Sequence, residues 1–170
     1  MKKLVLFSLL CIAPFAMFAQ EELLNAKLVE EVVILSTCNR TELYIVSQHP
    51  KEAMIRWWLQ TKNVSKDYQE YIIIRDEIDA LCHLMRTASG LESMILGEPQ
   101  ILGQVKQAYL TACEVGTIGP QLEHLFPLVF ATSKRVRTHT TIGVHPVSIA
   151  YTAVDLMKRE FADLQHKTVL

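Results

Sequence analysis

Two kinds of hydrophobic pattern divide the chain near residue 75. Before that point, short runs of β-branched and apolar residues indicate strands, at Val32–Leu35, Leu43–Val46 and Tyr71–Ile74. The segments between them fit helices, one over Glu21–Leu28 and one from Pro50 through Gln60. With a further strand near Leu4–Leu6, the order becomes β-α-β-β-α-β, which is typical of a ferredoxin-like lobe.

After Arg75 the apolar spacing changes to that of helices. Four helices are expected, with these limits: Asp76 to Gly90, Pro99 to Gly116, Pro120 onward, and Pro146 to Phe161. Pro127 lies inside the third and predicts a kink. The apolar face expected for the first consists of Ile78, Leu81, Cys82, Met85 and Ala88. The sequence therefore predicts an α+β fold, a ferredoxin-like lobe followed by a helical lobe.

Residues 1–20 have a pattern of their own. Two lysines precede an apolar run from Leu4 to Ala19, which is typical of a secretory signal peptide. Pro14 disfavours a membrane-spanning helix, and a buried first strand is the alternative. The expected division is a signal-like or atypical first-strand segment at 1–20, a ferredoxin-like catalytic lobe at 21–75, a helical part at 76–166 and the start of another domain at 167–170.

Composition narrows the function classes only a little. The chain has 170 residues, of which half are apolar, so it can build one core or two small lobes. Its net charge of -1 gives no overall basic field for nucleic acid. Four cysteines show no C-x-x-C pair and no zinc-type spacing, so we expect neither a metal site nor a disulfide framework.

Candidate chemistry is concentrated in residues 36–42, Ser-Thr-Cys-Asn-Arg-Thr-Glu, between two predicted strands. Cys38 would lie in a turn beside Thr37, Asn39 and Arg40, whose hydrogen-bond donors could stabilise a thiolate. The alternatives are a small buried cysteine and a surface arginine in a salt bridge. Cys82 and Cys113 are expected on apolar helix faces, which leaves Cys38 as the candidate nucleophile.

A second segment sharpens this interpretation. Residues 90–104 read Gly-Leu-Glu-Ser-Met-Ile-Leu-Gly-Glu-Pro-Gln-Ile-Leu-Gly-Gln. Together with residues 36–42 it resembles the catalytic domain of glutamyl-tRNA reductase, over about Val29 to Leu170. The resemblance implies that Cys38 attacks the ester joining glutamate to its tRNA. The thioester would then be reduced by hydride from NADPH to glutamate-1-semialdehyde, at the start of tetrapyrrole (porphyrin) biosynthesis in the cytoplasm. The signal-like start leaves an exported or membrane-anchored protein as the alternative.

The resemblance also implies a set of site residues. Cys38 and His83 would be catalytic, with His83 acting as a general acid/base or as a positioning group. Without the resemblance, His83 would be a partly buried, hydrogen-bonded histidine, and Glu98 a charge that complements a helix N-terminus. The implied substrate-binding residues are Thr37, Asn39, Arg40, Ser93, Glu98, Pro99, Gln100 and Gln104.

Partners and cofactor follow from the same resemblance. The partners would be glutamyl-tRNA, an aminomutase acting next in the pathway, and a second copy of the chain, although the dimerisation helix is expected to be absent here. Lys134, Arg135 and Arg137 could contact phosphates or form a solvated helix face. No G-x-G-x-x-G occurs, and Lys167–Leu170 would begin a truncated dinucleotide domain, so no NADPH site is expected. A non-enzymatic tRNA-binding module and an exported thiol protein remain alternatives.

Overall fold

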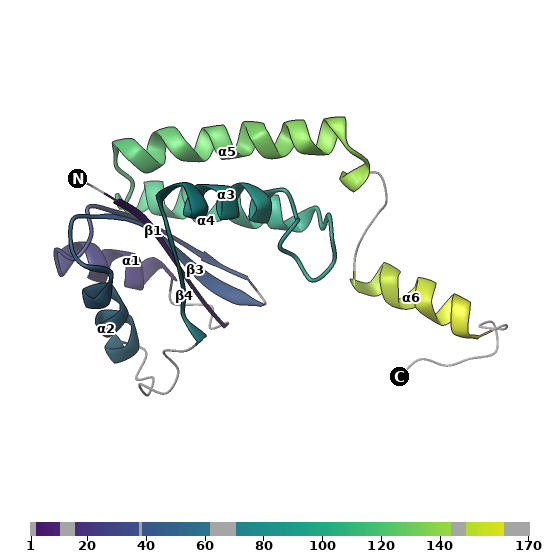
Figure 1. Cartoon of the computed structure of the whole chain (residues 1–170), viewed down its shortest axis with the longest axis horizontal. Coiled ribbons are helices and arrows are strands. Elements are labelled where there is room, and N and C mark those ends of the chain that lie inside the picture. The colour runs from purple at the N-terminus through teal and green to yellow at the C-terminus, as the bar shows by residue number, and fades with distance from the viewer. Residues whose placement is uncertain (1–2, 11–15, 38, 62–70, 144–148, 162–170) are drawn as a thin grey trace.

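The computed structural model of the chain describes residues 3–10, 16–37, 39–61, 71–143 and 149–161. It combines a four-stranded sheet with helices on both faces (Figure 1). The strands are β1 Lys3–Leu10, β2 Glu31–Ser36, β3 Arg40–Ser47 and β4 Ile73–Asp76. The helices are α1 Ala16–Asn25, α2 Lys51–Thr61, α3 Glu77–Ala88, α4 Gln100–Glu114, α5 Pro120–His139 and α6 Ile149–Glu160, with a short 3₁₀ turn, η2, at Thr141–Gly143.

The sheet is antiparallel, with strand order β2-β3-β1-β4. Residues 3–10 form β1 in its centre, which is the arrangement that a first-strand interpretation of the N-terminal segment expects. Val33 of β2 lies opposite Tyr44 of β3, and the pairing continues to Ser36 opposite Thr41. The last residues of β2 and the first of β3 are therefore joined by a short turn that contains Cys38.

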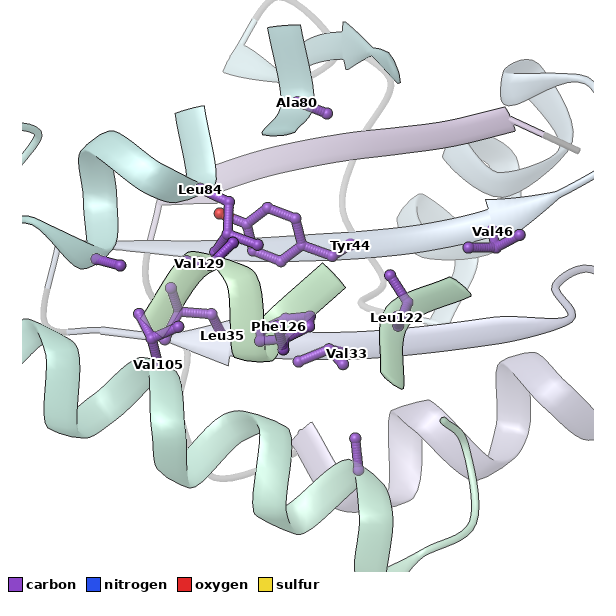
Figure 2. Close-up of a cluster of buried hydrophobic side chains, with 12 residues drawn as sticks. Val33, Leu35, Tyr44, Val46, Ala80, Leu84, Val105, Leu122, Phe126 and Val129 are labelled. Carbon is purple, nitrogen blue, oxygen red and sulfur yellow. The ribbon is translucent and has the colours of Figure 1, made fainter. Parts of the chain in front are cut away.

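Alternate residues of β2 and β3 enter two separate cores, because successive strand side chains point to opposite faces. Val32, Ile34, Leu43 and Ile45 pack against α1 and α2. Val33, Leu35, Tyr44 and Val46 pack against α3, α4 and α5, as Figure 2 shows around Tyr44 and Phe126. Burial on both faces explains why these strands are nearly continuous apolar runs in the sequence.

Two polar contacts join the helical half to β2. Glu31 is buried, and its carboxylate accepts hydrogen bonds from the backbone N–H groups of Gln121 (3.1 Å) and Leu122 (2.7 Å) at the start of α5. These N–H groups have no partner inside the helix, so the carboxylate caps it. Thr117 accepts from the Val32 N–H and donates its hydroxyl to the Val32 carbonyl, both at 2.9 Å.

Several predicted boundaries are displaced. The helix expected over Glu21–Leu28 is α1 at Ala16–Asn25, because Lys27 adopts a positive φ of 54° and reverses the chain. The strand expected at Tyr71–Ile74 is β4 at Ile73–Asp76. The helix α5 continues through Pro127, where a kink stays a prediction. Lys167–Leu170 and Cys11 lie outside the described residues.

The apolar face predicted for α3 is confirmed for Ala88, which is buried, and for Leu81 and Met85, which pack against the core, but it is wrong for two residues. Ile78 is 69 % exposed and Cys82 is exposed, while the buried side chains are those of Ala80, His83, Leu84, Thr87 and Ala88. Small and polar residues occupy the buried side because α3 packs closely on the sheet and meets a buried carboxylate there. The apolar spacing alone therefore included Ile78 and Cys82 and missed the buried polar residues His83 and Thr87.

The helix α6 extends away from the sheet and from the other helices in Figure 1. Its described part runs from Ile149 to Glu160, and Pro146, where the helix was expected to begin, lies outside the described residues. None of the helices within the described ranges combines the length and the apolar character that crossing a membrane requires.

Candidate active site

The turn between β2 and β3 is organised by Thr37. Its hydroxyl donates to the Arg40 carbonyl at 3.0 Å and accepts from the backbone N–H groups of Arg40 (3.1 Å) and Asn39 (3.3 Å). The Thr37 N–H also donates to the Arg40 carbonyl at 2.9 Å. These bonds fix the residues on both sides of Cys38, which itself lies outside the described residues.

Beside this turn is a cavity of about 250 Å³. Its walls come from three segments that are far apart in the sequence: the turn, the loop between α3 and α4, and the first turns of α4. Seven of the predicted substrate-binding residues line it, namely Thr37, Asn39, Arg40, Ser93, Glu98, Gln100 and Gln104, and Glu92, Met94, Ile95 and Ile101 complete the wall. Of the predicted set, Pro99 directly precedes α4 and does not line the cavity.

Arg40 is held in place from three directions. Its Nε donates to Glu42 Oε1 at 2.5 Å, one terminal nitrogen donates to the Glu92 carbonyl at 2.8 Å, and the other lies 3.4 Å from Thr87 Oγ1. A guanidinium carries five N–H groups, so one on each terminal nitrogen is not used in these bonds. Arg40 is therefore a fixed cation in the cavity wall and not a mobile surface side chain.

Behind Arg40 lies a buried carboxylate, Glu42. Its Oε1 is 2.8 Å from His83 Nε2, and its Oε2 accepts a short hydrogen bond from the Tyr44 hydroxyl. Burial alone would raise the pKa of Glu42, but hydrogen bonds from His83 and Tyr44 and the charges of His83 and Arg40 together lower it below its usual value. Burial and the adjacent Glu42 raise the pKa of Tyr44 well above 10. Glu42 is therefore an anion, and Tyr44 keeps its proton.

His83 does not face the cavity. It is buried on α3, and its Nε2 lies near both Glu42 Oε1 and, at 3.4 Å, Thr87 Oγ1. The structure therefore brings His83 to the carboxylate that holds Arg40, one layer behind the cavity wall.

Sequence reasoning missed Glu42 and Tyr44, although both lie within or beside the candidate segment. A Glu between apolar strand residues was an available signal, because a buried carboxylate needs charged or hydrogen-bonding partners.

Sequence reasoning also missed the role of Arg137. This residue donates to the Glu98 carbonyl at 2.8 Å and lies 3.4 Å from that of Gly97, so it supports the cavity loop, while Lys134 and Arg135 stay exposed.

The base of the loop between α3 and α4 depends on two glycines. Gly90 and Gly97 have positive φ angles of 81° and 83°, and the Gly97 N–H donates to the Gly90 carbonyl at 2.9 Å. A Cβ on Gly97 would lie 2.3 Å from the Ile142 carbonyl oxygen, which is too close for any atom. The position therefore accepts only glycine without movement of the loop or of η2.

Gly97→Ala should lower the free energy of unfolding by about 1–3 kcal/mol, because alanine is strained at this φ and collides with backbone. Urea denaturation followed by circular dichroism measures this. The matched control is Gly103→Ala, since Gly103 lies inside α4 with open space around its Cβ position. Alanine there should stabilise the protein by about 0.5–1 kcal/mol. Equal effects of the two substitutions would contradict this account of the loop.

A metal centre finds no support in the part of the chain that the structure describes, where no group of three or more His, Cys, Asp or Glu side chains is placed to hold an ion. Cys82 and Cys113 are both exposed, and neither lines the cavity, so their expected position on buried apolar faces is wrong. What the cavity offers is a fixed cation together with amide and hydroxyl groups.

Comparison with known proteins identifies relatives of this arrangement. A family model described as "Glutamyl-tRNAGlu reductase, N-terminal domain" matches residues 13–140. Glutamyl-tRNA reductase of Coxiella burnetii (strain Dugway 5J108-111) is 47 % identical over 153 residues, which cover 89 % of this chain and 37 % of that protein. Glutamyl-tRNA reductase of Pseudomonas putida (strain GB-1) is 49 % identical over 142 residues, covering 82 % and 33 %.

A solved structure shows the same likeness. Glutamyl-tRNA reductase from Methanopyrus kandleri is 30 % identical, with a TM-score of 0.70, over 96 % of this chain and 41 % of that one. The chain therefore spans only about a third to two fifths of the length of these relatives.

Proposed function

The chain belongs to the family of the glutamyl-tRNA reductase N-terminal domain, and from this we propose that it binds the glutamyl end of glutamyl-tRNA and takes the glutamyl group onto Cys38. The observation that carries the proposal is the cavity beside Arg40. Seven residues that the family resemblance implies as substrate-binding, from three separate segments, line this one space. Its volume of about 250 Å³ suits an amino-acid side chain together with an ester.

In the proposed step the Cys38 thiol first loses its proton to solvent. The thiolate attacks the ester carbonyl carbon, a C–S bond forms, and the C–O bond to the ribose breaks. The ribose oxygen takes up a proton and leaves as a hydroxyl. Arg40 binds the side-chain carboxylate of the glutamyl group, because a fixed guanidinium favours a carboxylate over a neutral amide. His83 and Glu42 act behind it as positioning residues.

The family resemblance implies NADPH as the hydride donor for reduction of the thioester, in tetrapyrrole biosynthesis. A dinucleotide needs a strand, a glycine-rich turn and a helix that follow one another directly. The six glycines lie between α3 and α4, within α4, between α4 and α5, or in η2. These residues do not fit the cofactor, so we assign hydride transfer to none of them. Without hydride, water would release free glutamate from the thioester.

We also propose that β1–β4 with α1 and α2 form the ferredoxin-like lobe, and that the helices from α3 onward form the helical part of the catalytic domain. The element order β-α-β-β-α-β through Asp76 supports this division.

The test is a single-turnover incubation of the protein with glutamyl-tRNA labelled in the glutamyl group. Acid quenching should trap label on the protein, and free glutamate should appear with time. A gel shift with charged and uncharged tRNA runs beside it. Equal binding of both tRNAs without any labelled protein would identify a non-enzymatic RNA-binding module instead.

Arg40→Lys should lower the rate of glutamyl transfer about 10- to 100-fold. A lysine cannot reach Glu42, Thr87 and the Glu92 carbonyl together and still present a fork to the substrate. The matched control is Arg86→Lys, because Arg86 is an exposed arginine that pairs with Glu92 at 2.5 Å and does not line the cavity. If Arg40→Lys transfers the glutamyl group as fast as wild type, the assigned role is wrong.

A further inference from the structure

Three polar residues follow one another along one face of β3. Arg40, Glu42 and Tyr44 alternate along the strand, so their side chains leave the sheet on the side that α3, α4 and α5 cover. Arg40 lines the cavity, Glu42 is buried behind it, and Tyr44 is buried in the core beneath these helices (Figure 2). The proposed transfer step uses Arg40 and Glu42 and gives Tyr44 no role.

The partners of Glu42 are divided unequally between its two carboxylate oxygens. Arg40 Nε, at 2.5 Å, and His83 Nε2, at 2.8 Å, both lie at Oε1. The Tyr44 hydroxyl donates to Oε2. Contacts at one oxygen alone leave a carboxylate able to turn about that oxygen, whereas a donor at the second oxygen fixes the plane of the group. Tyr44 therefore sets the direction in which Glu42 presents Oε1 to Arg40.

Tyr44 is suited to this task because its own ring is held firmly. The ring meets Phe126 of α5 edge-on, with 6.2 Å between centroids and an interplanar angle of 87°. Phe126 in turn stacks on Tyr109 of α4, with centroids 5.2 Å apart. Burial and the adjacent Glu42 raise the pKa of Tyr44 well above 10, so its hydroxyl stays a donor at neutral pH. The helices therefore fix both the position of the hydroxyl and the direction in which it donates.

From this geometry we propose that Tyr44 is a positioning residue for glutamyl transfer. Its hydroxyl holds the Glu42 carboxylate, and the carboxylate holds Arg40 in the orientation that binds the side-chain carboxylate of the glutamyl group. The proposal rests on the proposed function, which assigns this ligand to Arg40. Tyr44 does not line the cavity, so it acts on the substrate through its two neighbours on the same strand face.

The first test is Tyr44→Phe, which removes the hydroxyl and keeps the ring. The measured quantity is the ratio of kcat/KM for glutamyl-tRNA to that for glutaminyl-tRNA, determined on one protein sample. A loss of folded protein lowers both rates equally, so a merely structural role would leave this ratio unchanged. If Tyr44 positions Arg40, the ratio should fall about tenfold, the scale of one hydrogen bond to a charged group.

The matched control is Tyr109→Phe, which removes a hydroxyl from the same aromatic cluster at a residue that does not line the cavity. Its ratio should equal that of wild type. When Glu42→Gln is already present, Tyr44→Phe should change the ratio by about twofold or less, because its effect passes through the carboxylate. The proposal is overturned by an unchanged ratio in Tyr44→Phe, by an equal fall in Tyr109→Phe, or by a full effect of Tyr44→Phe beside Glu42→Gln.

The second test does not depend on the transfer step. Exchange of the Arg40 Nε–H with solvent is followed by NMR in protein that carries ¹⁵N-labelled arginine. A Glu42 carboxylate that is free to turn should speed this exchange about tenfold in Tyr44→Phe and leave it unchanged in Tyr109→Phe. Equal exchange in wild type and Tyr44→Phe would overturn the proposal. If wild type transfers no glutamyl group, the proposed function fails, and the exchange rates still decide whether Tyr44 positions Arg40.

Discussion

Cys38→Ser should reduce the amount of glutamyl group trapped on the protein about 10³-fold or more, the scale on which loss of a nucleophile is felt. A serine hydroxyl ionises far less readily than a thiol and needs an adjacent base. In the described part of the site, the one nearby imidazole, His83, is turned toward Glu42 at 2.8 Å. Among the residues that the structure describes, no free imidazole is therefore placed to activate a serine at position 38. Acid-quenched incubation with labelled glutamyl-tRNA measures the effect.

The controls are Cys82→Ser and Cys113→Ser, which remove the two cysteines found exposed on α3 and α4. Both variants should trap label at the wild-type rate, since neither residue lines the cavity. Exposed thiols also react with alkylating reagents. Inactivation by such a reagent therefore reports on Cys38 only in the double variant that carries both Cys82→Ser and Cys113→Ser. Normal labelling of Cys38→Ser, or loss of labelling in either control, would remove Cys38 from the mechanism.

Glu42→Gln should lower the free energy of unfolding at pH 7 by about 3 kcal/mol, the lower end of the cost of breaking a buried ion pair. Gln keeps the shape but removes the charge that Arg40 and His83 face. Because Arg40 is part of the cavity wall, glutamyl transfer should fall as well. Urea denaturation at pH 7 gives the stability, with Glu92→Gln as control. Glu92 forms a more exposed pair with Arg86, so its loss should cost less than about 1 kcal/mol.

The pH dependence of the free energy of unfolding tests the role of the same carboxylate independently. The pKa of Glu42 in the folded protein is lowered below its ordinary value of 4.5. Its contribution to stability is therefore fully present above pH 4.5 and is lost as the pH falls through the lower folded pKa. Wild type should lose stability on acidification in that range, and Glu42→Gln should lose less. Parallel curves for the two proteins would show that Glu42 is not the titrating group.

The short motifs predicted residues that the fold brings to one cavity, because a chemical pattern survives small errors in element boundaries. Thr37, Arg40, Ser93 and Gln104 were chosen without knowledge of their distances, and the fold brings them to one cavity. The apolar run of Val32 to Leu35 likewise predicted a strand, and the fold buries that strand on both faces. Local sequence is sufficient for such features since the turn and the helix start are fixed by nearby residues.

The layer behind the cavity could not be predicted in the same way. Whether His83 faces solvent, substrate or a carboxylate depends on Glu42, which is 41 residues away and reaches it only through the packing of α3 on the sheet. The same packing buries Ala80 and Thr87 and exposes Ile78, against the hydrophobic pattern. Tertiary contacts of this kind override local preference, and the sequence shows only that a charge in an apolar run must find partners.

Arg40 bonds to residues 47 and 52 positions further along the chain, so it joins the sheet to the loop between α3 and α4. In kinetic terms these are contacts of high sequence separation, which form only after the entropy of closing a long loop has been overcome. The sheet with α1 and α2 can gain its own core before that happens. We therefore expect substrate binding to be gained in the last phase of refolding, after most of the secondary structure has returned.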